Sequence, residues 1–395
     1  MHEKSESNRI ATIDVLRGWA LLGILVMNIQ AFALPTATYF NPQVYGGFSE
    51  TDRLAWFATR LLFDVKFLSI FSMLFGASLV LAADGPREKR RLGSLWVFGL
   101  VHGYLIFIGD ILFTYATVGF LILAARGWSI ERQARTGMGL LIVAPLSLAA
   151  LGFSYDWLPK SWHSEITRTI TDIDVAQELL VFRSEYLKQL QLRAELSFSN
   201  QVFGTLFESG WQAAGCMLLG MAGVQSKFFE GRTRIHRHSM TFFMVGLLIT
   251  AAGMSVALSG RFTPKAWLYG QALHLIGSAG VAFGWVAFLI RLAQASALQG
   301  LISRVGRLGK VAFSAYIIQS LAGLLVFGGS GLGQYGQWSR TQLFLAPFGF
   351  WAVQVLLAGF WTSCFRVGPL EALWRGIYRG DFSLGRIRTV EPPEE

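Results

Sequence analysis

The chain has very few cysteines and few charged residues for its length. Only Cys216 and Cys364 occur among 395 residues, and both stand in apolar stretches, which excludes a disulfide framework. The six histidines are scattered or lie in a basic loop, so none of them forms a cluster with the spacing of a metal site. Charged residues make up 15% of the chain and hydrophobic residues 53%, with a mean hydropathy of +0.46. This balance excludes an ordinary soluble domain and indicates a membrane protein.

The sequence also lacks a cleavable signal peptide. Asp14 and Arg17 interrupt the entry to the first apolar run, and Pro35 follows that run without a small-x-small cleavage site. We therefore expect the first span to remain as an anchor. The net charge of +10 is no evidence for nucleic-acid binding, because the basic residues cluster in short loops between apolar spans, as orientation in a bilayer requires.

Apolar runs of about 20 residues predict an all-α polytopic membrane protein that forms one transmembrane domain over residues 1–395. Ten such runs lie at about 13–34, 54–83, 92–108, 111–125, 137–153, 201–224, 240–258, 266–290, 308–327 and 342–365. Only Gly109 and Asp110 separate the third run from the fourth, which predicts a tight hairpin at one membrane face.

The distribution of Lys and Arg predicts that both termini are cytoplasmic. With the N-terminus inside, the short inner loops at 84–91, 126–135, 225–238 and 291–310 hold fifteen basic residues and the short outer loops hold four. The tail at 366–395 then adds five more on the cytoplasmic side.

The longest polar segment, residues 154–200, is expected on the outer side. Apolar residues recur in it at helical spacing: Ile166, Ile170, Ile173, Ala176, Leu180, Leu187, Leu190 and Ala194. This pattern predicts an amphipathic helix on the outer membrane surface, serving either as a scaffold or as a lid over a cavity.

Ionisable side chains occur inside the first two spans. Because such groups are costly in hydrocarbon, they indicate that part of the protein interior is polar. Asp14 and Arg17 share a helix face, either as an interfacial pair or with Arg17 facing a phosphate-bearing ligand. Asn28 lies about 16 Å further along and needs a hydrogen-bond partner. In the second span Arg60 and Asp64 are spaced to pair, whereas Lys66 is expected to face elsewhere. These groups indicate either a polar cavity or a structural ion-pair cluster.

The third span carries His102, and Asp110 follows eight residues later, about 12 Å along a straight helix. A direct bond between them is therefore not expected, and we interpret them as two separate polar sites. His102 is either an acid/base or a satisfied structural residue, and Asp110 either serves the site or caps the next helix. The remaining buried polar candidates are Glu208, Gln271, His274 and Gln319. Gln271 and His274 share a face, and His274 is the alternative base.

Five ordered blocks resemble the YeiB-like family of bacterial membrane proteins, a family described as domain of unknown function 418. The blocks are RIATIDVLRGWALLGILVMNIQAF, KFLSIFSMLFG, RRLGSLWVFGLVHGYLIFIGDIL, GRLGKVAFSAYIIQS and GPLEALWR. This resemblance implies a multi-pass protein of the bacterial inner (cytoplasmic) membrane. The opening block also resembles the first helix of transmembrane acyltransferases, including heparan-alpha-glucosaminide N-acetyltransferase and the bacterial acyltransferase-three proteins. Those families imply an acyl-CoA donor on the cytoplasmic side and a sugar acceptor on the other.

The chain departs from both acyltransferase patterns at their catalytic histidines. Asn28 stands where the bacterial enzymes carry one, and residues 35–53, where the heparan enzyme carries its own, contain no histidine. Any acyl transfer would therefore need another base, for which His102 is the first candidate.

The leading hypothesis is a membrane acyltransferase that moves an acyl group, most simply acetyl from acetyl-CoA, to a periplasmic glycan or lipid-linked acceptor. In this hypothesis Asp14 and Arg17 belong to the cofactor-binding site, where Arg17 and nearby basic residues contact the CoA phosphates, and His102 and Asp110 are catalytic. The cavity is lined by Asn28, Asp64, Lys66, Glu208, Gln271, His274 and Gln319. The alternatives are a secondary transporter that uses the buried charges as a pathway, or a non-catalytic membrane scaffold. Membrane lipids are expected partners, no metal is expected, and the oligomeric state stays open, with a homodimer included.

Overall fold

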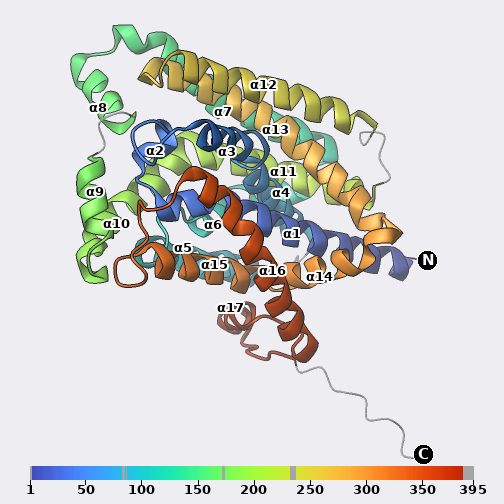
Figure 1. The fold of residues 1–395 in the computed structure, drawn as a ribbon. Helices are drawn as coiled ribbons and strands as arrows, with labels where there is room; N and C mark the ends of the chain where they lie inside the picture. The colour runs from blue at the N-terminus through green and yellow to red at the C-terminus, as the bar shows by residue number, and fades with distance from the viewer. Residues whose placement is uncertain (1, 82–84, 86, 171–173, 232–236, 386–395) are drawn as a thin grey trace, which may run out of the picture.

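The structure is a computed structural model that describes residues 2–81, 85, 87–170, 174–231 and 237–385. Its described elements are all helices (Figure 1). They are α1 (His2–Ala33), α2 (Ala37–Phe40), α3 (Glu50–Leu62), α4 (Lys66–Leu81), α5 (Arg87–Leu105), α6 (Leu112–Ile122), α7 (Ile130–Ser154), α8 (Lys160–Ile170), α9 (Val175–Phe182), α10 (Tyr186–Ser199), α11 (Gly210–Gln225), α12 (Ser239–Ser259), α13 (Pro264–Gln294), α14 (Gln299–Lys310), α15 (Ala312–Phe327), α16 (Arg340–Cys364) and α17 (Pro369–Arg379). A π-helical stretch, Asn200–Ser209, joins α10 to α11.

Long apolar helices give the protein the architecture of a multi-pass membrane protein. Six helical stretches in the described part of the chain are long and apolar enough to span a bilayer, and α14 with α15, bent by 83°, would make a seventh. Other expected spans coincide with shorter helices, among them α5, α6 and α11. The ten spans and the cytoplasmic termini stay predictions. Parts of the basic loops 84–91 and 225–238 and of the tail 366–395, as well as Ile173, lie outside the described residues.

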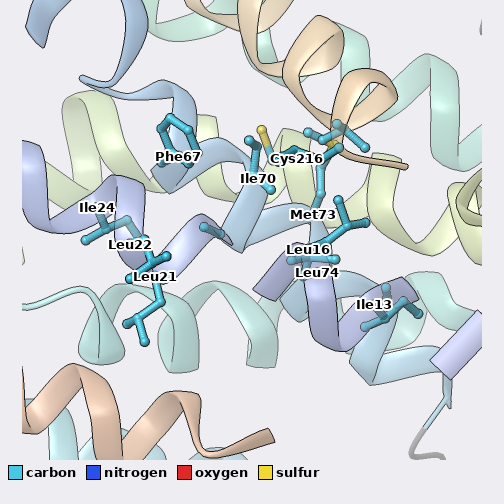
Figure 2. Packing of buried hydrophobic residues seen from close by; sticks show 14 of the residues in the cluster. Ile13, Leu16, Leu21, Leu22, Ile24, Phe67, Ile70, Met73, Leu74 and Cys216 are labelled. Atoms are coloured by element: carbon cyan, nitrogen blue, oxygen red, sulfur yellow. The ribbon is translucent and has the colours of Figure 1, made fainter. Parts of the chain in front are cut away.

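Helix α1 lies at the centre of the largest hydrophobic core. Its residues Leu16 and Leu21 are fully buried and belong to one cluster with Ile70 and Met73 of α4 (Figure 2). Because lipid tails are as apolar as leucine, such helices are held together in a membrane mainly by close van der Waals packing. The first span is therefore an interior helix, whereas most of the residues of α12 and α16 are not buried inside the bundle.

Helices α4 and α11 cross so closely that only glycine fits at the contact. A Cβ atom on Gly76 would lie 2.0 Å from the backbone oxygen of Met217, and one on Gly220 would lie 1.8 Å from that of Met73. Small residues that let helix backbones approach are a common device in membrane proteins. This contact fixes α4, which carries site residues, against the rest of the bundle.

We expect Gly76→Ala to lower the free energy of unfolding by about 1–3 kcal/mol, because the added methyl group forces the two backbones apart. Gly139→Ala is the control, since a Cβ at Gly139 would meet nothing within 4 Å. The measurement is thermal unfolding of both variants in a mild detergent. Equal unfolding temperatures for the two variants would contradict the close crossing.

The segment expected as one outer amphipathic helix is divided into α8, α9 and α10 (Figure 1). Buried Glu178 of α9 connects this segment to the end of α1. Its carboxylate accepts hydrogen bonds from Thr36 N (3.0 Å), Thr36 Oγ1 (2.8 Å) and the Tyr335 hydroxyl (3.0 Å). Burial is the largest influence on the Glu178 carboxyl and raises its pKa above the usual value.

The raised pKa predicts that the folded protein gains stability from Glu178 at low pH. This contribution is fully present below the ordinary glutamate pKa of about 4.3 and is lost as the pH rises through the folded-state pKa. Thermal unfolding between pH 4.5 and 7.5 should therefore show a stability increment on acidification that Glu178→Gln lacks. Glu185→Gln is the control, because it removes an exposed carboxylate from the same segment. The prediction fails if wild type and Glu178→Gln have parallel pH profiles.

Candidate functional site

The second predicted span is broken in the middle, between α3 and α4. Val65 has a φ of +64°, in the left-handed region that a β-branched residue rarely adopts. The break ends α3 at Leu62 and starts α4 at Lys66, so the polar side chains around it no longer follow the spacing of one helix. This local geometry turns Lys66 back toward α3.

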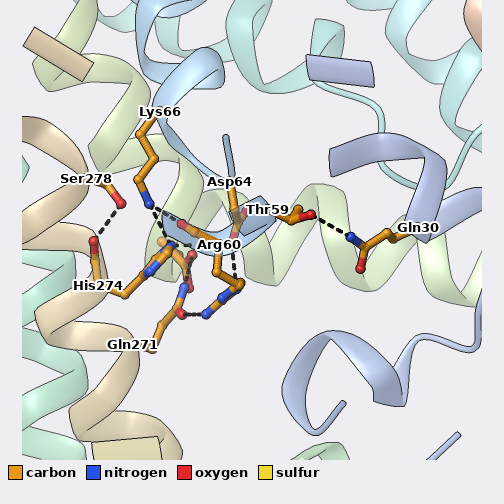
Figure 3. Close-up of polar contacts among 9 residues, drawn as sticks. Gln30, Thr59, Arg60, Asp64, Lys66, Gln271, His274 and Ser278 are labelled. Atoms are coloured by element: carbon orange, nitrogen blue, oxygen red, sulfur yellow. Dashed lines mark hydrogen bonds and ion pairs between the residues drawn. The ribbon is translucent and has the colours of Figure 1, made fainter. Parts of the chain in front are cut away.

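Six buried or half-buried side chains meet at this break, and we call them the Arg60 cluster. They are Arg60, Asp64, Lys66, Glu208, Gln271 and His274, and most of them are visible in Figure 3. The cluster joins the α3/α4 break to α13 and to the π-helical stretch before α11. In this way three stretches that are distant in the sequence contribute to one polar site.

The Arg60 guanidinium is the centre of the cluster. Its Nη1 pairs with Asp64 Oδ2 at 2.5 Å, and its Nη2 donates to Gln271 Oε1 at 2.8 Å. Gln271 in turn donates to Glu208 Oε1 at 2.9 Å. The predicted pair of Arg60 with Asp64 is therefore present, and Gln271 links it to a second acidic residue.

Lys66 belongs to the same cluster, contrary to the expectation that it faces elsewhere. Its Nζ donates to the Arg60 backbone oxygen at 2.5 Å and lies 3.5 Å from His274 Nε2. His274 Nε2 also lies 3.3 Å from Asp64 Oδ2. The expectation assumed a continuous helix, and the break at Val65 is the physical reason that it was wrong.

The formal charges of the cluster cancel when His274 is neutral, because two cations face two carboxylates. Near-complete burial makes such compensation necessary: Lys66 is 0% exposed, and Asp64 and His274 are each 1% exposed. A pocket beside the cluster reaches Arg60, Gln271 and His274 and is otherwise lined mainly by aromatic and small residues. The Arg60 guanidinium also lies 5.2 Å from the centre of the Tyr39 ring in this pocket.

The second polar site is a direct pair of His102 and Asp110. His102 Nδ1 lies 2.8 Å from Asp110 Oδ1, and the two residues are 1% and 2% exposed. The expectation of two separate sites was wrong because α5 ends at Leu105 and the chain folds back before Asp110. The 12 Å separation holds only along a straight helix.

Asp110 also caps α6, the other role weighed for it. Its two carboxylate oxygens accept hydrogen bonds from Leu112 N (3.1 Å) and Phe113 N (2.9 Å). A carboxylate held by a helix N-terminus is a fixed acceptor, so the proton of a neutral His102 ring is on Nδ1. In the part of the chain that the structure describes, His102 Nε2 has no hydrogen-bond partner. Nε2 is thus a buried acceptor whose lone pair is unpaired among the described residues.

The other predicted residues lie apart from these two sites. Gln319 Nε2 donates to Leu21 O (3.3 Å) and to Gln354 Oε1 (2.9 Å), which is a helix-to-helix contact. Asn28 is buried at 5% exposure and has no contact with either site among the hydrogen bonds of the described residues. Arg17 pairs with Asp14 at 2.9 Å, as the spacing predicts.

The chain resembles a family model described as a protein of unknown function (DUF418) over residues 219–381. It is also 30% identical over 399 residues to the Escherichia coli (strain K12) protein YeiB, described as uncharacterized, with 93% of this chain and 95% of that relative aligned. The chain belongs to the YeiB-like DUF418 family. Another relative, the uncharacterized Bacillus subtilis (strain 168) protein YxaH, is 27% identical over 403 residues, which cover 93% of this chain and 94% of the relative.

In this DUF418 protein, the family model and the full-length relative cover different parts of the two polar sites. The matched region contains Gln271 and His274 of the Arg60 cluster but neither His102 nor Asp110. The similarity to YeiB nevertheless extends over nearly the whole chain. Both polar sites therefore lie in a chain that is similar to YeiB over 93% of its length.

Two buried charged residues of the segment 154–200 were not singled out from the sequence. Glu178 and Arg193 stand among many exposed charges in a polar stretch, so composition does not mark them as buried. Only their neighbours in the fold show that they are interior.

Proposed function

We propose that this DUF418 protein is a transmembrane acyltransferase in which His102 is the general acid/base. The observation that carries the proposal is the buried His102 and Asp110 pair, with Nδ1 held by the carboxylate and Nε2 unoccupied by any described residue. A carboxylate that fixes the tautomer of a histidine and stabilises its imidazolium is the usual support for acid/base catalysis at Nε2.

The chemistry required of this pair is the transfer of an acyl group from a thioester to a hydroxyl. Nε2 removes the proton of the acceptor hydroxyl as its oxygen attacks the thioester carbonyl carbon. The carbon–sulfur bond then breaks, and the CoA sulfur leaves with the proton held on Nε2. The products are an ester and free CoA, and His102 returns to its starting state.

The donor would approach from the predicted cytoplasmic end, at Arg17 and Asp14. Arg17 Nη1 donates to Asp14 Oδ1 and, at 3.4 Å, to Gly309 O, and its side chain is 27% exposed. Lys310 follows Gly309 and brings a second cation to this place. An arginine fork beside a lysine is suited to phosphate groups of CoA. The proposal includes the ten-span topology with both termini in the cytoplasm.

Helix α1 sets the distance that the donor must bridge. Phe32 packs on Phe107 with ring centres 4.0 Å apart, and Phe107 contacts His102. Phe32 is fifteen residues after Arg17, about 22 Å along the helix. The long, unbranched pantetheine arm of CoA is the kind of group that can extend from one site to the other.

The deciding experiment incubates purified protein in nanodiscs with acetyl-CoA labelled in the acetyl group. Transfer of label to membrane lipid or added glycan, with release of free CoA, supports the proposal. The proposal is overturned if acetyl-CoA neither binds nor loses its label under any acceptor tested.

A second candidate function, secondary transport, is favoured by the Arg60 cluster. A helix interrupted at mid-span and lined by ionisable groups is the usual site of substrate and ion binding in transporters. Proteoliposomes with a pH-sensitive dye test this directly. Substrate-driven proton flux that Asp64→Asn abolishes would favour transport over acyl transfer.

A further inference from the structure

Arg193 of α10 is a buried cation that lacks an acidic partner among the described residues. It is 6% exposed. Its Nε and Nη2 donate to Gln189 Oε1 at 3.3 and 2.9 Å, and its Nη1 donates to Ile106 O at 3.0 Å. All of these acceptors are neutral. Its guanidinium also lies 5.0 Å from the centre of the Phe182 ring.

The hydrogen bonds of Arg193 leave donors unused. A guanidinium has five N–H groups, and three are engaged, so one on each terminal nitrogen stays available. Terminal N–H groups of this kind are donors with which arginine binds phosphate or carboxylate. Burial lowers the pKa of the guanidinium from its usual value, which reflects the cost of an uncompensated interior charge. An anion at this position would offset that cost.

A small pocket adjoins Arg193 and is lined mainly by apolar groups. Its other walls come from Phe32, Phe107, Phe182, Gly323 and Tyr335, among others. Exposed Ala31 and half-buried Leu324 stand at its edge. The neighbouring residues Leu321 and Leu325 of α15 are 48% and 61% exposed, as side chains that face lipid are. An anionic site next to an apolar surface fits an amphiphile rather than a free ion.

Phe107 separates this pocket from the catalytic pair. Its ring lines the pocket, stacks on Phe32, and lies 6.1 Å from the His102 ring between centres. A ligand anchored at Arg193 is therefore one aromatic side chain away from His102. Movement of the Phe107 side chain would open this pocket toward the His102 ring.

We propose that Arg193 binds the anionic head group of an amphiphilic acceptor, a lipid that carries a phosphate or carboxylate near the hydroxyl to be acylated. This inference rests on the proposed acyltransferase function for the role of the ligand, but the binding site itself stands on its own geometry. The head group binds the guanidinium, the hydrocarbon chain lies along α15, and the hydroxyl is directed past Phe107 to His102.

The test measures lipid binding to the full-length protein in detergent by native mass spectrometry. The probes are phosphatidylglycerol, phosphatidylcholine with the same chains, a polyprenyl phosphate, and inorganic phosphate. Wild type is expected to bind an anionic lipid at least about tenfold more tightly than phosphatidylcholine, and Arg193→Gln should lose that preference. Lys188→Gln removes an exposed cation from the same helix and should leave the preference unchanged.

Two further variants keep the test decisive if Arg193→Gln does not fold. Arg193→Lys retains the charge but loses the fork, and weaker anionic binding is expected. Gly323→Ala places a methyl group 2.6 Å from the Phe32 ring, which pushes that ring into the pocket. Wild-type binding in both variants would overturn the inference, as would competition by inorganic phosphate as strong as that of the lipids. The two anionic lipids show whether the source is a bulk phospholipid or a polyprenyl carrier.

The outcomes separate this inference from the proposed function. Anionic lipid binding that depends on Arg193, without any acyl transfer, would retain the site and overturn the acyltransferase. Acyl transfer that depends on His102 but is the same in Arg193→Lys and Gly323→Ala as in wild type would retain the enzyme and overturn the acceptor site.

Discussion

Replacing His102 with alanine is expected to lower the rate of acyl transfer by about 10²–10⁴-fold, the usual contribution of a positioned acid/base. The imidazole is the group whose Nε2 stands free of any described partner while Asp110 holds Nδ1. The measurement is initial transfer of labelled acetyl from acetyl-CoA in nanodiscs. Binding of acetyl-CoA should be retained, because the donor phosphates are assigned to the opposite end of α1.

The controls for this prediction separate catalysis from folding. His238→Ala removes an exposed histidine and should leave the rate unchanged. Asp110→Asn keeps one oxygen that can accept from the N-terminus of α6, but its amide nitrogen replaces the second accepting oxygen, and the side chain no longer supplies an anionic acceptor for Nδ1. We expect this variant to be slow, and its unfolding temperature shows how much of the loss is due to the weakened cap. Full activity in His102→Ala would exclude His102 as the base. His274 would then be the alternative candidate for that role.

Replacing Asp64 with alanine is expected to lower the free energy of unfolding by about 3–5 kcal/mol. The reason is that removal of one buried partner leaves the Arg60 and Lys66 cations without their nearest carboxylate. Denaturation in a mild detergent, followed by tryptophan fluorescence, measures the effect. Such a loss is large, because it is comparable to the whole stability of many proteins.

Two companion variants test the physical reason for that loss. Glu131→Ala breaks an ion pair whose side chains are 77% and 71% exposed, and it should leave the unfolding curve unchanged. The double variant Arg60→Met with Asp64→Leu removes both members of the pair and should be more stable than Asp64→Ala alone. If Asp64→Ala unfolds like wild type, the cluster is not held by compensation of charge.

The sequence was informative wherever the argument depended on hydropathy and on local spacing. Long apolar runs predicted a helical membrane protein, and the described part of the chain has six to seven helical stretches of that kind. Spacing of three or four residues predicted the pairs of Asp14 with Arg17 and of Arg60 with Asp64, which are both present. Such pairs depend only on the geometry of a single helix turn.

The same reasoning failed wherever the chain departs from a continuous helix. The turn after Leu105 brings Asp110 back to His102, and the left-handed residue Val65 brings Lys66 to His274. Neither break is marked by proline, and Gly109 lies beyond the end of α5. The apolar pattern therefore placed the end of the third span at residue 108 and predicted no break within the second. Gln319 was assigned to the cavity on polarity alone, and spacing did not predict the hydrogen bond by which it joins neighbouring helices.

The sequence by itself determined that this is a multi-pass helical membrane protein with ionisable groups in its interior, because transfer into hydrocarbon depends on residue type and run length. Only the tertiary structure decided which of those groups meet. Contacts such as Lys66 with His274, or Arg193 beside Phe107, join segments far apart in the chain. They depend on where helices break and how closely glycines let them cross, and neither property can be read from the period of an apolar pattern.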